Sequence, residues 1–575
     1  MFVSNMWRHG IAVGFLTAAT CAHGQVTTDL AAPQLQLQQQ RERALAEQAA
    51  ARLPDVRLPR ESVAAGVDYP QHEAPCFVIE RIKLDGDDAS RFQWALTAAA
   101  DARGRCLGSG GINTVLARVQ NALIGAGYVT TRVVAAPQDL RSGTLVLVLV
   151  PGRIRAVRFA APEGDAAGAT AGSIKPPTHY WNTLPASPGD LLNLRDIEQG
   201  LENFKRVPTA EADIQMVPGS APGDSDLLVK WRQSQWVRLS LSVDDGGSDA
   251  TGKYQGNATL SLDNPFGLQD LFYFSFSNDL SGNGPNGRRG TRGHGLFYSI
   301  PFGYWLLALT GNDYGYRQSI AGASQNYVYS GSSRNLDLKL SRVVYRNAVR
   351  KVGAFVRGYQ RNSKNFIDDT EIEVQRRKMG GFELGVTDKE FIGDATLDTS
   401  LAYKRGAGAF GTLTAPEEAF GEGTSRPHII TGDVSLALPF QVAGSHFDYQ
   451  GSLHAQWNRS TLIAEDRFAI GGRYTVRGFD GESSLSAERG WLLRNEVGWS
   501  PAGMRQQFYA GLDYAELGGP STALLLGTRL GGAVLGWRGQ WMGLQYDFFA
   551  GKPVVKPQRF HSAAVASGFS INYQF

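Results

Sequence analysis

The sequence predicts a mainly β protein, in which a sixteen-stranded transmembrane β-barrel follows an N-terminal helix and two small α+β domains. The main observation is a series of segments with alternating apolar and polar residues, which continues from residue 236 to residue 575. Two similar patterns of strands and helices precede this series. No run of about 18 apolar residues follows residue 24, so the rest of the sequence lacks the pattern of a membrane-spanning helix.

The first 24 residues are typical of a secretory signal peptide. A basic residue, Arg8, precedes an apolar run from Ile11 to Ala19, and small residues favour cleavage before Gln25. The run is too short to span a bilayer as an anchor. A lipidated Cys21 is the alternative, although the preceding Ala-Ala-Thr fits that signal poorly. We therefore expect export from the cytoplasm.

Residues 25–52 are rich in Gln, Ala, Leu, Arg and Glu, which favour helix. The apolar stripe of this segment is thin, so it predicts either a polar helix lodged in a wet cavity or a disordered tail. Residues 53–75 contain four prolines and no periodicity. This composition is typical of a linker.

Two domains are predicted at 76–151 and 152–235, because each contains a similar order of elements. In the first we expect a strand at 76–84, helices at 89–101 and 112–124, and strands at 130–135 and 144–150. In the second we expect a strand at 153–159, a helix at 191–204, and strands at 212–217 and 227–231. A stretch rich in Pro and Gly, 176–189, takes the place of the other helix.

Residues 236–575 predict the barrel. Apolar and polar residues also alternate along the strands of a soluble β-sandwich. Here, however, the apolar face carries aromatic residues in one strand after another. The connections between strands also alternate between short and long, as in outer-membrane barrels. A barrel of this size encloses an aqueous lumen. The strands are expected to begin near Trp236, Tyr254, Asp270, Arg292, Trp305, Ser333, Lys351, Met379, Asp394, Ile429, Phe447, Gly490, Gln507, Thr522, Trp541 and Ala564.

Several function classes are excluded by composition and motifs. The net charge of +3 argues against a nucleic-acid partner, and three cysteines exclude a disulfide-rich scaffold or a multi-cysteine metal array. Residues 282–287 match the letters of a dinucleotide fingerprint, but no βαβ unit surrounds them. There is no P-loop, HExxH pair or GxSxG elbow, and the nine histidines are scattered. We therefore expect no enzyme, no cofactor and no metal.

Cys76 and Cys106 both fall in the first small domain of an exported chain. A disulfide between them would close a loop of about 30 residues and contribute roughly 3–4 kcal/mol on the chain-entropy model. Two free thiols are the alternative, and we favour the bond.

The glycine-flanked segment 471–480 lies in the long connection between the eleventh and twelfth strands. It is either an ordinary solvated loop or a loop folded into the lumen. Strand parity places Asp513 and Glu496 on the lumenal face, so an inward loop would bring Arg477 against these carboxylates. A close pair at an effective dielectric near 20 is worth about 4 kcal/mol before desolvation.

The residues Val476, Arg477, Gly478 and Phe479 look like the signature of the sixth extracellular loop in the superfamily of POTRA-plus-barrel outer-membrane proteins. Residues 511–515 resemble the partner motif of the barrel wall, with Ala515 where glycine is common. The two small domains resemble POTRA domains. This resemblance implies that Arg477 pairs with Asp513. Glu496, which strand parity places one strand away, is the rival partner.

A narrower resemblance covers nearly the whole chain after residue 30. Two POTRA-like domains, a helical N-terminal segment, and the stretches 127–132 and 137–140 are similar to two-partner secretion transporters (TpsB). These are the haemolysin-activator and filamentous-haemagglutinin exporters, some of which share the sequence contexts of Cys76 and Cys106.

The resemblance implies a transporter in the outer membrane of a Gram-negative bacterium, with its POTRA domains in the periplasm. It would bind one large unfolded TpsA-like exoprotein and pass it through the barrel without nucleotide energy. Residues 25–52 would be a plug helix. Outer-membrane lipid and the barrel-assembly machinery are further expected partners, the latter through the terminal aromatic residue Phe575. An insertase of other barrels and a passive porin are the alternatives.

Overall fold

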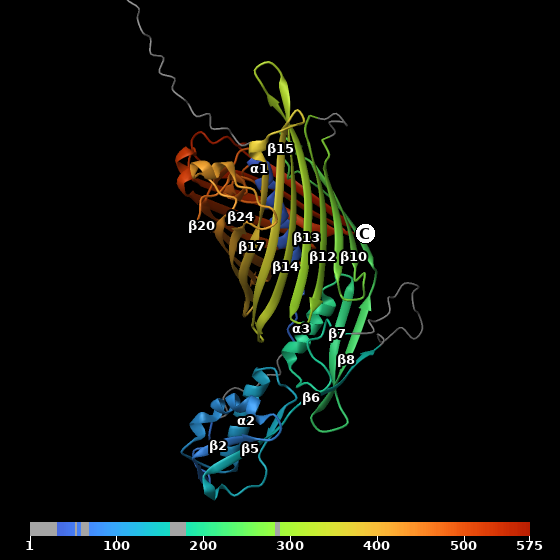
Figure 1. The fold of residues 1–575 in the computed structure, drawn as a ribbon. Coiled ribbons are helices and arrows are strands. Elements are labelled where there is room, and N and C mark those ends of the chain that lie inside the picture. Colours follow the sequence, from blue (N-terminus) through green and yellow to red (C-terminus); the bar gives the residue numbers. More distant parts are fainter. Residues whose placement is uncertain (1–30, 52–53, 59–67, 161–179, 282–287) are drawn as a thin grey trace, which may run out of the picture.

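The computed structural model describes residues 31–51, 54–58, 68–160, 180–281 and 288–575. A closed barrel forms one end of the molecule and two small domains lie in series beyond its lower rim (Figure 1). The signal peptide predicted for residues 1–24, with the alternative at Cys21, lies outside the described residues. No described helix combines the length and hydropathy needed to cross a membrane.

The barrel consists of sixteen long antiparallel strands, as the sequence predicted, and β27 pairs with β9 to close it. A two-residue strand, β16 (Thr370–Glu371), pairs antiparallel with the far end of β15. The long strands are β9 Val237–Asp244, β10 Gln255–Asp263, β11 Leu271–Asp279, β12 Gly290–Phe302, β13 Trp305–Ala321, β14 Asn326–Arg346, β15 Arg350–Ile367, β17 Arg377–Ile392, β18 Ala395–Ala407, β19 His428–Val442, β20 Ser445–Asn458, β23 Arg489–Ser500, β24 Gln506–Gly518, β25 Arg529–Trp541, β26 Leu544–Val555 and β27 Ala566–Gln574.

Two strands begin seven residues away from the predicted position: β14 begins at Asn326, before the expected Ser333, because its pairing with β13 continues to the Ala321–Asn326 pair, and the fourteenth strand begins later than expected. The fourteenth was expected near Thr522, but Pro520–Leu524 form a short 3-10 helix, η6, and β25 begins at Arg529. Proline fixes its backbone angle at a helical value and has no N–H for a strand partner, so it favours a helix start at this position. Further short helices lie at η3 Glu373–Gln375 and η4 Pro416–Phe420.

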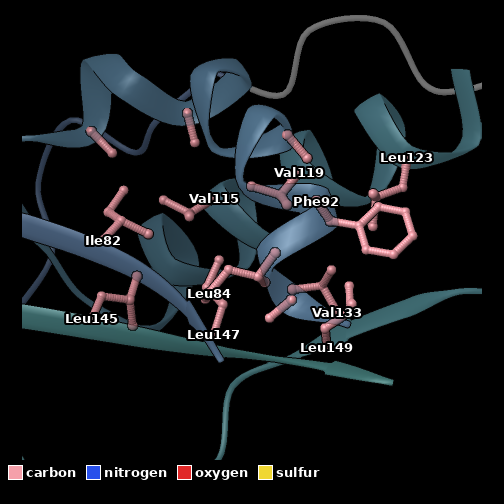
Figure 2. Packing of buried hydrophobic residues seen from close by; sticks show 14 of the residues in the cluster. Ile82, Leu84, Phe92, Val115, Val119, Leu123, Val133, Leu145, Leu147 and Leu149 are labelled. Atoms are coloured by element: carbon pink, nitrogen blue, oxygen red, sulfur yellow. The ribbon is translucent and has the colours of Figure 1, made fainter. Parts of the chain in front are cut away.

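The first small domain packs two helices on a three-stranded sheet of order β2-β5-β4. Its elements are β1 Phe77–Ile79, β2 Arg81–Asp85, η1 Ala89–Ala102, β3 Arg105–Leu107, α2 Ser109–Gly125, β4 Arg132–Val134, η2 Leu140–Ser142 and β5 Thr144–Val150. Figure 2 shows apolar side chains of the strands and helices meeting in one core; they include Ile82, Leu84, Phe92, Val115, Val119, Leu145 and Leu147. Alternate residues of β5 are buried because one face of the sheet meets the helices.

Two details of this domain differ from the prediction. The strand expected at 76–84 is broken at Glu80, so that β1 pairs with the unpredicted β3, and β2 pairs in parallel with β5. The first helix, η1, has 3-10 geometry and a non-helical residue at Ala99. The sequence missed β3 because a strand of three residues carries too little alternation to recognise.

The linker residue Glu73 explains why α2 begins at Ser109 rather than near Ile112. Its carboxylate accepts hydrogen bonds from the N–H groups of Gly108, Gly110 and Gly111, at 2.7, 2.7 and 2.9 Å. Although burial disfavours the charge, these three donors hold the pKa of Glu73 below its usual range. An acidic side chain from outside the helix thus caps the helix N-terminus.

The second small domain contains β6 Arg153–Ala160, α3 Leu194–Lys205, β7 Ala210–Pro218 and β8 Asp224–Gln233. Its sheet has the order β6-β8-β7. The helix was expected from residue 191 but begins at Leu194, because the Asn193 side chain accepts the Arg195 N–H at 2.8 Å as an N-cap. Residues 161–179, which include the start of the Pro- and Gly-rich stretch, lie outside the described residues.

The N-terminal helix α1 (Ala31–Ala51) lies inside the barrel (Figure 1). Its buried residues Ala31 and Leu35 pack against tyrosines of the barrel wall, namely Tyr314, Tyr316 and Tyr329. Its polar residues bind lumenal side chains: Arg41 lies 2.8 Å from Asp244. A helix with so little apolar surface is stable here because a polar lumen surrounds it. This is the wet-cavity alternative of the sequence analysis.

A disulfide joins Cys76 to Cys106, which are 30 residues apart. It ties the residue before β1 to the middle of β3. It therefore reinforces a two-stranded sheet that has only three paired residues on each strand.

We expect this bond to stabilise the first domain by constraining its unfolded chain. Replacing both cysteines by serine in the full-length protein should lower the free energy of opening of this domain by about 3–4 kcal/mol. Hydrogen exchange of the α2 amides, followed by mass spectrometry, measures this. Reductant should have the same effect on the natural chain and none on the double variant. Free thiols in the mature, non-reduced protein would contradict the prediction.

Candidate functional site

The long connection between β20 and β23 folds into the barrel and packs there. It contains η5 (Ala464–Asp466) and the small strands β21 (Phe468–Ile470) and β22 (Leu485–Ala487), which pair antiparallel. Val476 is fully buried and Phe479 is 2% exposed. The Phe479 ring meets the edge of Phe560 at 5.7 Å between centroids. This inward loop, residues 459–488, is therefore packed rather than solvated.

Arg477 joins the loop to both candidate carboxylates. Its Nε and Nη2 donate to the two oxygens of Asp513, at 2.8 and 2.9 Å, and its backbone N–H donates to the same residue at 2.9 Å. Its Nη1 donates to Glu496. The arginine is 8% exposed and the Asp513 side chain is fully buried. The structure thus brings all three residues together, and the rival partners share the arginine.

Two further arginines of the wall complete the charge balance. Arg538 lies 2.8 Å from Glu496, and Arg494 lies 3.8 Å from Asp513. The two carboxylates therefore keep a cationic neighbour each, whereas Arg477 depends wholly on them. A buried charge that loses its partners costs about 3–5 kcal/mol, so this cluster fixes the position of the loop.

Three glycines, Gly478, Gly511 and Gly532, let the loop backbone approach the wall closely, and together we call them the glycine seat. Gly478 has a positive φ of 105°, and a Cβ there would lie 2.6 Å from the Lys552 carbonyl oxygen. On the wall, a Cβ at Gly532 would lie 1.9 Å from the Arg477 carbonyl oxygen, and one at Gly511 would lie 2.7 Å from its guanidinium. The sequence patterns did not predict these glycine contacts. Their only signal is glycine at lumenal positions of the neighbouring strands β24 and β25.

A second ionic anchor, also missed, holds the first limb of the loop. Asp466 lies 2.8 Å from Lys404 and 3.5 Å from Arg361, which belong to β18 and β15. Glu465 lies 3.8 Å from Arg377 of β17. The loop is therefore tied to two separate parts of the wall.

The helix α1 touches both the loop and the wall. Gln36 donates to the Ala464 carbonyl at 2.6 Å and Gln40 to the Ala469 carbonyl at 3.1 Å. On the same face of the helix Arg43 binds Asp433 and His454, which are 2.8 Å from each other. One face of the helix thus contacts both the loop and strands β19 and β20.

The remaining predicted residues lie elsewhere. Ala515 is buried beneath the apolar residues of the inward loop, so its methyl group is accommodated. Phe575 directly follows β27, and its N–H donates to the Leu239 carbonyl at 2.9 Å. The stretch 127–132 lies at the junction of the two small domains, because the Gly127 carbonyl accepts the N–H of Leu194 at 2.8 Å.

Comparison with known proteins identifies this architecture. Residues 223–539 match the family described as haemolysin secretion/activation protein ShlB/FhaC/HecB, residues 77–152 match the ShlB-type POTRA domain, and residues 153–218 match a POTRA domain. The outer membrane transporter CdiB-2 of Burkholderia pseudomallei is 38% identical over 95% of this chain and 94% of its own length.

Two solved structures share the fold. CdiB from Acinetobacter baumannii is 30% identical, with a TM-score of 0.83 over 95% of this chain and 99% of that one. CdiB from Escherichia coli is 25% identical, with a TM-score of 0.81 over 94% and 98%. The chain belongs to the haemolysin secretion/activation protein ShlB/FhaC/HecB family of two-partner secretion transporters, with its barrel in the outer membrane and its POTRA domains in the periplasm.

Proposed function

We propose that this chain moves one large TpsA-like exoprotein, in unfolded form, from the periplasm through the barrel to the cell surface. The observation that carries the proposal is a lumen occupied by two parts that are held in different ways. These are a wall-anchored inward loop and a helix held mainly by polar contacts. A passage that must open needs such a removable part.

The POTRA domains supply surfaces for an unfolded chain. In the second domain β7 is an edge strand, and its residues Met216 and Val217 are exposed. In the first, β4 is an edge strand with an exposed Val134. An edge strand accepts an extended chain through backbone hydrogen bonds, whatever its sequence. Folding of the exoprotein outside would supply the energy, since the sequence has no nucleotide-binding motif.

An insertase is the weaker alternative, because it usually carries more POTRA domains and lacks a plug helix. A passive porin needs no docking domains. Two further partners are expected. Outer-membrane lipid would contact exposed aromatic residues of the strands, such as Phe274 and Trp499. The barrel-assembly machinery would recognise the C-terminal end of the barrel, at β27 and Phe575.

Export of a specific partner is the first test. Co-expression with the product of the adjacent gene should release that product at the cell surface, and omission of this chain should retain it in the periplasm. Reconstituted vesicles should transport it without added nucleotide. Surface release that does not depend on this chain would refute the proposal, and assembly of unrelated barrels that does depend on it would favour the insertase.

Removal of the helix tests its role as a plug. A chain without residues 31–51 should conduct ions better in planar bilayers, because the lumen loses the helix that lies in it. Secretion should remain largely intact. Glu47→Gln is a matched control, since this helix residue is mostly exposed and contacts only Arg43 of its own helix among the described ion pairs. Unchanged conductance of the shortened chain would remove the plug role.

The cluster at Arg477 is expected to be needed for secretion and not for barrel assembly. Arg477→Ala should reduce secretion about tenfold or more, because buried carboxylates lose a partner worth several kcal/mol. Arg477→Lys should rescue only partly, since an ammonium cannot copy the planar fork. Asp513→Ala should resemble Arg477→Ala.

Double-mutant cycles on secretion yield, at matched barrel levels, measure the coupling. Arg477 should couple more strongly to Asp513, which accepts three of its hydrogen bonds, than to Glu496, which keeps Arg538. Arg357→Ala, which removes a wall arginine that pairs with Glu383 away from this cluster, is the control. Full secretion by Arg477→Ala would show that the cluster has no role in export.

A further inference from the structure

The linker between α1 and the first POTRA domain fills a groove at the periplasmic rim of the barrel. Residues 54–58 lie between α3 and the barrel turns. The N–H of Val56 donates to Glu202 at 3.1 Å, and the N–H of Leu58 donates to Glu198 at 3.0 Å. The carbonyl of Val56 accepts a hydrogen bond from Arg346, at the end of β14, at 2.5 Å.

These contacts recognise an extended backbone. The two donors are alternate residues, as in a strand that pairs along one edge. The acceptors are carboxylates one helical turn apart on α3. Their oxygens take the place of the backbone carbonyl groups that a neighbouring strand would provide. Any residue except proline can supply such an N–H group.

Side-chain contacts add a limited selectivity. The Val56 side chain is 8% exposed and packs into the apolar core of the second POTRA domain, with Ile197 and Leu201. Asp55 lies 2.9 Å from Lys351 and 2.6 Å from Lys389. The groove thus accepts one aliphatic residue preceded by an acidic one.

The groove does not need the linker for its own order. Glu198 is paired with Arg195 at 2.6 Å and with Arg346 at 3.2 Å, and Glu202 is paired with Arg346 at 2.9 Å. Glu198 and Arg346 are almost fully buried. If the linker left, both carboxylates would lose an N–H donor in a buried setting, which favours occupation by another backbone.

The position of the groove matters for transport. Figure 1 shows α3 directly beneath the barrel, so the segment follows a route between the lumen and the periplasm. Only residues 52 and 53 separate it from the end of α1. Ala51 and Pro54 are three Cα steps apart, which span at most about 11 Å, so α1 cannot leave the lumen as an intact helix without drawing the segment out of the groove.

We propose that this groove is a binding site for an extended segment of the exoprotein, and that residues 54–58 occupy it as an internal competitor while the lumen is closed. This rests on the function proposed above. The segment that it takes has an aliphatic residue after an acidic one. Exit of α1 vacates the groove, and the passing chain replaces the linker on the same oxygens of Glu198 and Glu202.

Photo-crosslinking during secretion tests the proposal. Phe391, whose ring lies 3.8 Å from the Arg57 guanidinium in the groove, is replaced by p-benzoylphenylalanine in cells that also produce the adjacent gene product. Gln441, at the periplasmic turn between β19 and β20, carries the same group as the control. We expect crosslinks to the exoprotein at position 391 and several-fold fewer at 441. Val56→Asp, which places a charge in the apolar pocket, should increase them.

Equal crosslinking at both positions would overturn the proposal, as would secretion accompanied only by crosslinks from position 391 to residues 54–58. Failure of the natural chain to secrete would instead refute the proposed function.

A binding measurement covers the case in which the substituted chains do not secrete. A fluorescent peptide with the sequence of residues 54–59 should bind the purified full-length Val56→Asp protein, by fluorescence anisotropy. The same peptide with proline at the Val56 position lacks the N–H donor and should bind about tenfold more weakly. Equal affinity of the two peptides would overturn the proposal.

Discussion

The arrangement of the lumen depends on one buried ionic cluster, in which Arg477 lies between Asp513 and Glu496. A guanidinium this far from water is stable only while both carboxylates stay within reach. Its bond to the wall therefore determines the course of the inward loop, and the loop in turn presents the backbone carbonyls that α1 contacts. The glycine seat serves the same contact, because a side chain at Gly532 would push the loop away from the wall.

The inward loop and helix α1 are held in the lumen by contacts of different strength. The loop is tied by buried ion pairs on both limbs, at Arg477 and at Asp466. By contrast, α1 meets the loop through two hydrogen bonds to carbonyls, each worth about 0.5–1.5 kcal/mol. Two ion pairs tie it to the wall: the Arg43–Asp433 pair is more than a third exposed on both sides and adds at most about 1 kcal/mol, whereas the Arg41–Asp244 pair is only 12% exposed on both sides and is the stronger one. Release of the helix therefore breaks one mostly buried pair but none of the ion pairs that hold the loop on the wall.

Much of this arrangement could be predicted from local patterns. Alternation gave the strand number and the lumenal side of Asp513, because side-chain direction in a strand follows residue parity. Parity could not decide between Asp513 and Glu496, since both point inward from neighbouring strands and one fork reaches both. The Lys404–Asp466 pair and the glycine seat join residues far apart in sequence, and only the register of the closed barrel brings them together. The break at Glu80 depends on which strand each half pairs with, which is likewise a long-range choice.

The second POTRA domain stays docked on the barrel whether or not the linker is present, because most of its contacts do not involve the linker. Asn203 donates to the Gly303 carbonyl at 2.8 Å, and Tyr304 donates to Asp196 at 2.6 Å. Arg346 remains paired with Glu198 and Glu202. Withdrawal of α1 therefore removes the occupant of the groove without releasing the walls of the groove. The opening of the lumen and the exposure of a backbone-binding site at its entrance are thereby a single event, linked by the two residues that separate α1 from Pro54.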